Sequence, residues 1–136
     1  MTRRRAPNRF ERTRLDHATE LAEDYTELIA ELIDTRGEAR VGDIAAALGV
    51  SHVAVSRMVG RLLAQGLVDT EPYQPVQLTP EGRAMARRAR KRHEIVVAFL
   101  ISIGVSPAQA ETDAEGIEHH CSKETIEAMA RAANIQ

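Results

Sequence analysis

The stretch "DAEGIEHHCS", from Asp113 to Ser122, places three carboxylates and two imidazoles within ten residues. On a helix, Glu115, Glu118 and His119 would stand at positions i, i+3 and i+4 and share one face. The two glutamates would repel each other there unless a cation lay between them. Carboxylate oxygens with a minority of imidazole nitrogens suit Mn²⁺ or Fe²⁺, whereas a structural zinc site would use thiolates. The stretch therefore predicts either a divalent-cation site or an ordinary solvated face.

Two other places in the chain carry similar donor groups. Asp24 and Glu27 have an i, i+3 relation on a helix predicted from Leu15 to about Thr35, and His93 stands beside Glu94 on a later helix. Each pair taken alone is typical of a solvated face. The joint occurrence of three such groups favours a shared metal site, although the sequence does not bring the helices together.

The elements that would position these residues are mostly helical. Aromatic residues make up only 3% of the 136 residues, so the core must consist of aliphatic side chains and methionine, a balance that favours helices. The chain is long enough for one domain or two very small ones. The first predicted helix carries apolar residues at three- and four-residue spacing: Leu21, Tyr25, Leu28, Ile29, Leu32 and Ile33.

A helix-turn-helix follows in "ARVGDIAAALGVSHVAVSRMVGRLLAQGLV". A short helix ends at Gly49, and Ser51 is placed to cap the next one. Two short apolar pieces, Leu67-Val68 and 76–78, then read as a small hairpin. The expected apolar stripes are Ile44, Ala45 and Leu48 on the first helix and Val55, Met58, Val59 and Leu62 on the second. Residues 15–79 are therefore predicted to form a winged helix-turn-helix DNA-binding domain.

In this class of domain the second helix of the pair enters the major groove. Arg57 is the best candidate for a base contact, because a guanidinium can donate two hydrogen bonds to guanine, while Arg61 suits a phosphate. Ordinary solvent exposure is the alternative for His52 and Ser56. The candidate DNA-binding residues are Ser51, His52, Ala54, Ser56, Arg57 and Arg61.

Residues 80–136 are predicted to be helical throughout. Thr79-Pro80 starts a long helix that runs to about Ile103, and Ser106-Pro107, Asp113 and Ser122 start three short ones. The apolar residues of this part exceed the needs of so small a bundle, which predicts a homodimer interface. They include Ile95, Val96, Phe99, Leu100, Ile117, Ile126 and Met129.

Charge and cysteine content narrow the class of protein. Residues 1–14 form a basic arm that we expect to be disordered, and a second cationic block runs from Arg83 to Arg92. Such blocks are solvated faces or phosphate-binding surfaces. The single Cys121, read as a buried free thiol or less simply as a redox group, together with the lack of a leader or membrane-spanning run, predicts a soluble, cytoplasmic protein with no membrane partner.

The motifs "AEDYTELI", "VGDIAAALGVSHVAVSRMVGRL", "LTPEG", "RHEIV" and "DAEGIEHH" together resemble the manganese-responsive transcriptional regulators of the diphtheria-toxin-repressor family. The resemblance extends from about Leu21 to Glu127. It implies a homodimeric repressor that binds double-stranded operator DNA when Mn²⁺ is abundant and shuts down manganese-uptake genes.

The resemblance also implies a set of metal ligands around a two-metal cluster, hence about two ions per subunit, with Fe²⁺ or other divalent metals as possible occupants. Glu115 stands where iron-responsive relatives carry sulfur ligands, which favours manganese. His120 would face away from this cluster. The implied ligands are Asp24, Glu27, His93, Glu115, Glu118 and His119.

Two alternatives remain open at this point. One is a winged-helix regulator whose DNA binding does not depend on metal. The other is a carboxylate-bridged di-metal enzyme, although the chain has Glu-x-x-Glu-His where helical di-metal bundles carry Glu-x-x-His.

Overall fold

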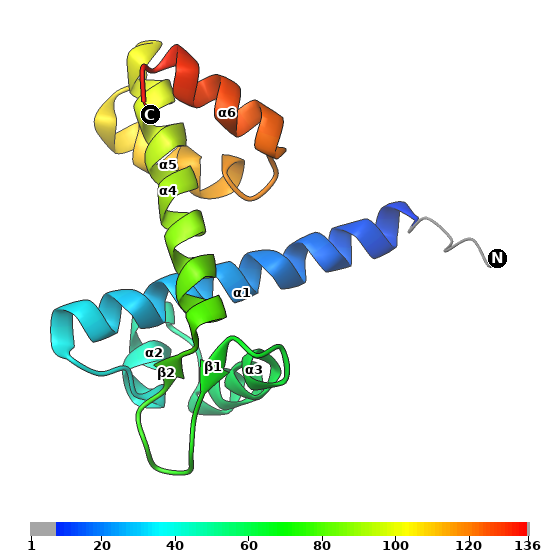
Figure 1. Cartoon of the computed structure of the whole chain (residues 1–136), viewed down its shortest axis with the longest axis vertical. Coiled ribbons are helices and arrows are strands. Elements are labelled where there is room, and N and C mark those ends of the chain that lie inside the picture. The colour runs from blue at the N-terminus through cyan, green and yellow to red at the C-terminus, as the bar shows by residue number, and fades with distance from the viewer. Residues whose placement is uncertain (1–7, 136) are drawn as a thin grey trace. The chain divides into compact units, whose positions relative to one another are not determined.

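The structure is a computed structural model that describes residues 8–135 (Figure 1). The prediction of a mostly helical fold with a small β wing is confirmed. None of the helices among the described residues is long and apolar enough to cross a membrane. The elements in chain order are α1 (Arg9–Arg36), α2 (Val41–Leu48), α3 (His52–Ala64), β1 (Val68–Asp69), β2 (Gln77–Leu78), α4 (Pro80–Ser102), α5 (Pro107–Ile117) and α6 (Lys123–Ala132).

The chain divides into two compact units. The first, called here the wing unit, is Glu23–Glu94, and the second, the terminal unit, is Met1–Ala22 with Ile95–Gln136. The helices α1 and α4 each run through both units. The wing unit therefore includes the first half of α4, beyond the predicted domain boundary at residues 79 and 80. That boundary stays a prediction.

Helix α1 begins earlier than expected. Residues 9–14 are helical, so the prediction of a disordered arm is wrong for them, and residues 1–7 lie outside the described part of the chain. The cause is a reciprocal cap. The Glu11 backbone N–H donates to Asn8 Oδ1 at 2.8 Å, and the Asn8 backbone N–H donates to Glu11 Oε2 at 3.0 Å.

The helix-turn-helix of the wing unit forms as predicted. Gly49 ends α2 in the left-handed conformation, at φ 67°, which a glycine adopts without steric cost. The Ser51 side chain then caps α3 by accepting a hydrogen bond from the Ala54 backbone N–H. All of the predicted apolar residues of the two helices are buried except Leu48, which is 38% exposed because it stands on the last turn of α2. Helix α1 adds Tyr25, Ile29 and Leu32 to the core of this unit.

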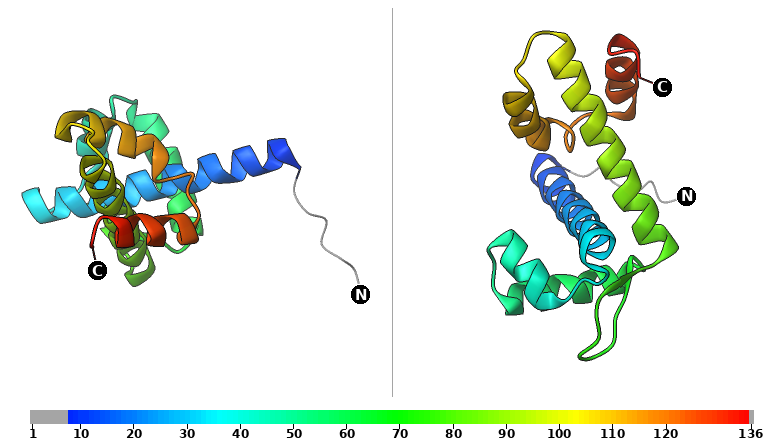
Figure 2. Two further views of the ribbon diagram at one scale, coloured as in Figure 1. Left: turned by 90° about the horizontal axis from the view of Figure 1, so that it is seen from above. Right: turned by 90° about the vertical axis from the view of Figure 1, so that its left-hand side faces the viewer.

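The predicted wing is present as an antiparallel pair in which Val68 lies opposite Leu78. Thr79 joins it to α4: its hydroxyl donates to the Gly66 carbonyl at 2.7 Å and accepts from the Gly82 backbone N–H at 3.1 Å. A Cβ on Gly82 would stand 2.0 Å from the Leu67 carbonyl oxygen. Only glycine therefore allows the first turn of α4 to approach the wing this closely. The hairpin loop projects from the two strands in Figure 1 and in the right-hand view of Figure 2.

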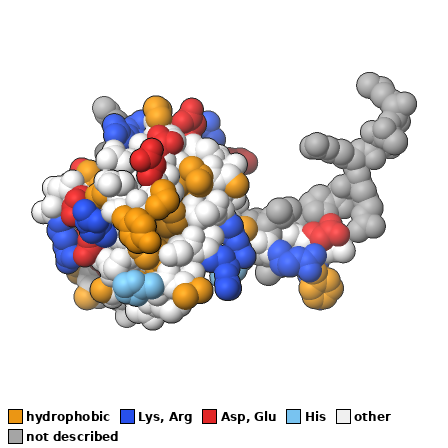
Figure 3. Space-filling model, turned by 90° about the horizontal axis from the view of Figure 1, so that it is seen from below, with side chains coloured by type: hydrophobic (Ala, Val, Ile, Leu, Met, Phe, Trp, Pro, Cys, Tyr) orange, Lys and Arg blue, Asp and Glu red, His pale blue; other side chains and the backbone are white. Residues whose placement is uncertain are grey.

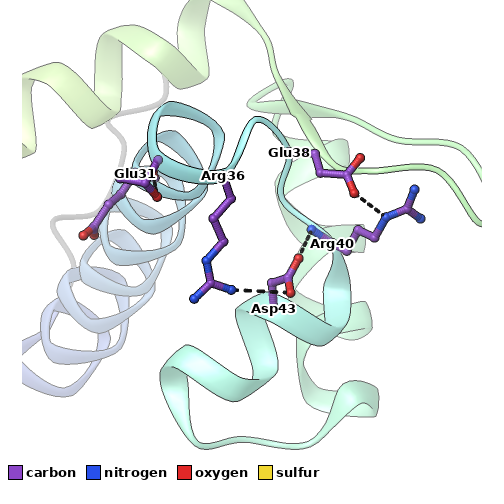
Figure 4. A network of polar contacts seen from close by, with 6 residues as sticks. Glu31, Arg36, Glu38, Arg40 and Asp43 are labelled. Carbon is purple, nitrogen blue, oxygen red and sulfur yellow. Dashed lines mark hydrogen bonds and ion pairs between the residues drawn. The ribbon is translucent and has the colours of Figure 1, made fainter.

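Polar contacts at the entry to α2 join it to the end of α1 (Figure 4), and Arg40 also contacts the wing loop. Asp43 accepts from the Arg40 backbone N–H at 3.3 Å and lies 3.7 Å from Arg36 Nη1. The Arg40 guanidinium donates to Glu38 Oε1 at 2.8 Å and to the Tyr73 carbonyl at 3.4 Å. Arg40 therefore supports the tip of the wing.

The terminal unit packs α5 and α6 against the second half of α4 (Figure 2). Ser106 and Ser122 cap α5 and α6 as predicted. Asp113 does not start a helix, which corrects the prediction. It lies inside α5, where its carboxylate accepts from the Gln109 side-chain amide at 2.8 Å. A buried hydrophobic cluster of this unit contains Ile95, Val96, Ala114 and Ile126.

Some of the apolar residues of 80–136 that led us to predict a dimer interface are buried within the subunit. Ile95, Val96 and Ile126 are buried in the core of the terminal unit, so they are not available to a second copy. Ile101 and Ile103, at the end of α4, are instead 43% and 62% exposed.

Candidate DNA-binding surface and metal-binding residues

The outer face of α3 is the candidate DNA-reading surface. Its inner face is formed by four buried residues, and every residue predicted to contact DNA lies on the exposed remainder. With 100° between successive helical residues, Val53, Arg57, Gly60 and Ala64 point most directly away from the buried face. Arg57 is therefore well placed for a base contact, and Arg61 lies toward one flank.

His52 and Ser51 are placed less favourably than predicted for base contact. The His52 ring lies over α2, since its Cε1 would be 3.5 Å from a Cβ on Gly42. The Ser51 oxygen is occupied as the cap of α3. Val53, which the sequence reading did not select, is 65% exposed on the outward ridge. An exposed apolar side chain there suits the methyl group of thymine.

The tip of the wing adds a second exposed group. Tyr73 is 96% exposed and has a backbone φ of 65°, a conformation that costs a non-glycine residue about 1 kcal/mol. Its carbonyl is held by Arg40, as described above. Figure 3 shows the face of the molecule on the side of the wing, with hydrophobic side chains near its middle and Lys and Arg toward its edges. The wing unit's exposed large apolar residues are Leu48, Val50, Val53, Leu63 and Tyr73.

Half of the candidate metal ligands lie in the wing unit. Glu27 of α1 and His93 of α4 line the same cavity, which has a volume of about 780 Å³. Both side chains are half-buried, as is Asp24 one turn before Glu27. The structure thus brings a carboxylate and an imidazole from distant parts of the sequence to one cavity. Such a pair of hard and borderline donors fits a divalent ion of the Mn²⁺ or Fe²⁺ type.

The other candidate ligands lie in the terminal unit, at the end of α5. Glu118 and His119 are both buried, each with a side chain only 3% exposed, and His119 Nε2 lies 3.4 Å from Glu118 Oε1. Glu115 is exposed. Glu118 caps α5 in a helical conformation and keeps the predicted i, i+3 relation to Glu115, whereas His119 lies in the turn beyond the helix.

Glu20 of α1 is a candidate that the sequence reading missed. Within the terminal unit, one of its carboxylate oxygens lies within 4.8 Å of a ring nitrogen of His119. It also lies 3.7 Å from Nε2 of His120, whose side chain is 58% exposed, in keeping with its expected place outside the ligand set. The available signal was spacing, because Glu20 stands one helical turn before Asp24.

Two further charged residues of the wing unit adjoin candidate ligands in the sequence. Glu23, beside Asp24, is only 6% exposed, and its carboxylate forms an ion pair with the guanidinium of Arg92, beside His93. Tyr25 on the other side of Asp24 is also buried, and this burial raises the pKa of its hydroxyl. Arg92 therefore does not belong to the solvated face predicted for its cationic block.

A winged helix with an exposed reading helix, followed by helices rich in carboxylate and imidazole donors, defines a class: metal-binding DNA-binding proteins. Comparison with family models gives the same division. Residues 17–76 match the iron dependent repressor N-terminal DNA binding domain, and residues 79–134 match the iron dependent repressor metal binding and dimerisation domain. The chain belongs to this iron-dependent repressor family, named also after the diphtheria toxin repressor.

Relatives from two bacteria carry regulator names. The chain is 50% identical over 120 residues to the "Transcriptional regulator MntR" of Escherichia coli O157:H7, which covers 88% of this chain and 77% of that protein. It is 44% identical over 105 residues to the "HTH-type transcriptional regulator MntR" of Listeria monocytogenes, covering 77% of this chain and 74% of the relative.

Solved structures agree in fold. The manganese regulator SloR superposes with a TM-score of 0.73 at 28% identity, over 85% of this chain and 54% of that chain. A manganese-dependent transcriptional repressor in complex with manganese gives a TM-score of 0.76 at 26% identity, over 85% and 53%. The chain thus spans about half the length of these solved structures.

Proposed function

We propose that this chain is a manganese-responsive transcriptional repressor, a homodimer that binds operator DNA when Mn²⁺ is abundant. The observation that carries the proposal is the pairing of an exposed recognition helix with half-buried or buried oxygen and imidazole donors in both units. The family is one of transcriptional regulators rather than enzymes. The di-metal enzyme considered above is accordingly set aside, and the site of action is the cytoplasm, where the chromosome lies.

The proposed ligands are the six inferred from the sequence, and about two ions per subunit would be held. Glu27 and His93 support the assignment through their shared cavity. Glu118 and His119 support it because their side chains are buried side by side, with His119 Nε2 3.4 Å from Glu118 Oε1, as two ligands of one ion would be. The donors are mostly oxygens with some imidazole, a composition that favours Mn²⁺ over zinc. The ion, when bound, supplies positive charge that neutralises these carboxylates.

The proposed switch acts on populations. Without metal, the clustered carboxylates repel one another, and the subunits of a dimer sample many separations of their recognition helices. Neutralised carboxylates favour the arrangement in which the two helices stand about one DNA turn apart, roughly 34 to 36 Å. A shift from 1% to 99% of the competent state requires about a ten-thousandfold preference of the metal for that state. Several shared ligands are needed to supply such a preference.

On the DNA, α3 would enter the major groove with Arg57 donating to guanine and Val53 contacting a thymine methyl. Arg61 would reach a phosphate. The exposed Tyr73 extends the surface to the tip of the wing. The hydrogen bond from Arg40 to the Tyr73 carbonyl favours this conformation of the tip before DNA binds.

Selection of bound duplexes from a random DNA pool tests the proposal. The pool is run in parallel with Mn²⁺, with Fe²⁺ under anoxia, and with a chelator. We expect a two-fold symmetric site to be enriched only with Mn²⁺. Equal enrichment with the chelator would leave a winged-helix regulator without a metal switch, and no enrichment in any arm would contradict DNA binding itself.

A further inference from the structure

Two charged side chains inside the wing unit connect the helices that carry candidate ligands. Glu23 lies on α1 and Arg92 on α4, and the carboxylate and the guanidinium form an ion pair. Their side chains are 8% and 31% exposed. Three other ion pairs of the wing unit, Arg36–Asp43, Arg40–Glu38 and Arg90–Glu94, are more exposed, and the more buried partner of each is still 36% exposed or more.

The surroundings of the pair fix its place. Thr26, fully buried on α1, donates its hydroxyl hydrogen to the Glu23 carbonyl at 3.0 Å, which holds this turn of α1. Ala89, one turn before Arg92 on α4, is 1% exposed. The ion pair therefore sits among packed residues where α1 and α4 approach each other. Losing one partner of such a pair leaves a poorly hydrated charge.

The pair adjoins the candidate ligands along both helices. Glu23 is the neighbour of Asp24 and lies one turn before Glu27, and Arg92 is the neighbour of His93. Glu27 and His93 line one cavity from the two opposite helices. A shift of α1 along α4 by one residue would move these donors apart by about 1.5 Å, which exceeds the tolerance of a metal-ligand bond.

We propose that the Glu23–Arg92 ion pair is a positioning element that fixes α1 against α4, so that Glu27 and His93 present their donor atoms to the same divalent cation. Neither side chain is a ligand in this proposal. The inference rests on the proposed metal function, and it concerns how this half of the site is held before the ion arrives.

The test is a double-substitution cycle with Glu23→Gln, Arg92→Gln and the double variant. Binding of Mn²⁺ is followed by loss of the electron paramagnetic resonance signal of the free ion, and thermal unfolding is measured in chelator. We expect either single substitution to weaken Mn²⁺ binding about ten- to hundredfold, the usual cost of losing an outer partner of metal ligands. The double variant should lose less than the product of the two, because a Gln–Gln contact retains a hydrogen bond between the helices.

Exposed residues of the same unit serve as matched controls. Arg36→Gln and Glu38→Gln each break an ion pair at the surface, and neither residue adjoins a candidate ligand. Both should leave Mn²⁺ binding unchanged. Circular dichroism in chelator confirms that each variant is folded before its metal affinity is compared.

Each outcome decides the matter. Coupling between the two positions in unfolding but not in Mn²⁺ binding would make the pair structural only and overturn the proposal. Weaker binding for Glu23→Gln with tighter binding for Arg92→Gln would show a simple effect of net charge and overturn it as well. Failure of the wild-type protein to bind Mn²⁺ would instead refute the proposed function, and the inference with it.

Discussion

The outer face of α3 and the candidate metal ligands hold their polar groups in opposite ways. On α3 the candidate DNA contacts are all exposed and are presented by a single helix. The candidate ligands come from α1, α4 and the end of α5, and Glu118 and His119 among them are buried. Exposed polar groups on one helix cost little free energy, whereas buried carboxylates lose hydration. The exposed contacts on α3 are thus in place in this structure, and a bound ion would add positive charge beside the buried carboxylates.

The largest effect on Mn²⁺ binding is expected from substitution of a buried candidate ligand. Glu118→Gln should weaken Mn²⁺ binding by more than about a hundredfold, because a ligand contributes more than an outer partner does. In chelator the same variant should unfold at a higher temperature, because a neutral amide loses less hydration on burial than a carboxylate. Calorimetric unfolding and Mn²⁺ titration check the two parts. A lower unfolding temperature of Glu118→Gln than of the wild type in chelator would contradict this expectation, and unchanged Mn²⁺ binding would remove Glu118 from the proposed ligands.

The exposed side is tested by Arg57→Ala. We expect DNA affinity with Mn²⁺ present to fall by about 1 to 3 kcal/mol and discrimination at one base position to relax. Mn²⁺ binding should stay at the wild-type level, because α3 carries none of the candidate ligands. Fluorescence anisotropy on operator variants measures both affinities. Arg88→Ala, an exposed arginine on α4, is the control and should have a smaller effect than Arg57→Ala.

Substitutions at two glycines test whether the stability of the wing unit depends on the close packing of α4 against the wing. Gly82→Ala would place its Cβ against the Leu67 carbonyl and should lower the free energy of unfolding by about 1 to 3 kcal/mol. Gly60→Ala has open space on α3 and should raise it by about 0.5 to 1 kcal/mol. Thermal unfolding of both variants distinguishes them. Similar changes of the same sign would contradict the close approach at Gly82.

The effect expected at the wing tip is smaller than that at Gly82. Tyr73→Gly relieves the positive φ and should raise the free energy of unfolding by about 1 kcal/mol, while DNA affinity falls because the exposed ring is lost. Tyr73→Phe keeps the ring and separates its contribution from that of the hydroxyl. Denaturant unfolding and anisotropy titrations provide the measurement. Unchanged DNA affinity in Tyr73→Gly would remove the wing tip from the reading surface.

Local patterns predicted the part of the fold that local chemistry determines. Gly49, Ser51, Ser106 and Ser122 all act at the helix ends where the sequence placed them. Asp113 has the same capping chemistry, yet it lies inside α5, where Gln109 one turn earlier donates to its side chain. The start of α1 was missed because a capping box between two polar residues lies outside the apolar repeat on which the prediction depended.

The sequence predicted which residue types could bind a metal ion, but it did not predict how buried each of these residues is. Their spacing made Glu115 and Glu118 equally good candidate ligands. In the structure, Glu115 is exposed and Glu118, at the end of α5, is buried. The cationic block around Arg92 gave no sign that one member enters an ion pair with Glu23, about seventy residues away in the chain. Such contacts depend on how two long helices pack, which no short stretch of sequence encodes.

The most direct test of the account measures the affinity of the wild-type protein for its selected duplex with Mn²⁺ and with chelator, beside Glu118→Gln and Arg57→Ala. We predict tight binding by the wild type only with Mn²⁺, weak binding by Glu118→Gln in both conditions, and for Arg57→Ala a weaker affinity that still rises with Mn²⁺. Equal affinity of the wild type with and without the metal would contradict the central claim that a metal ion bound at the buried ligands controls the affinity of the α3 face for DNA.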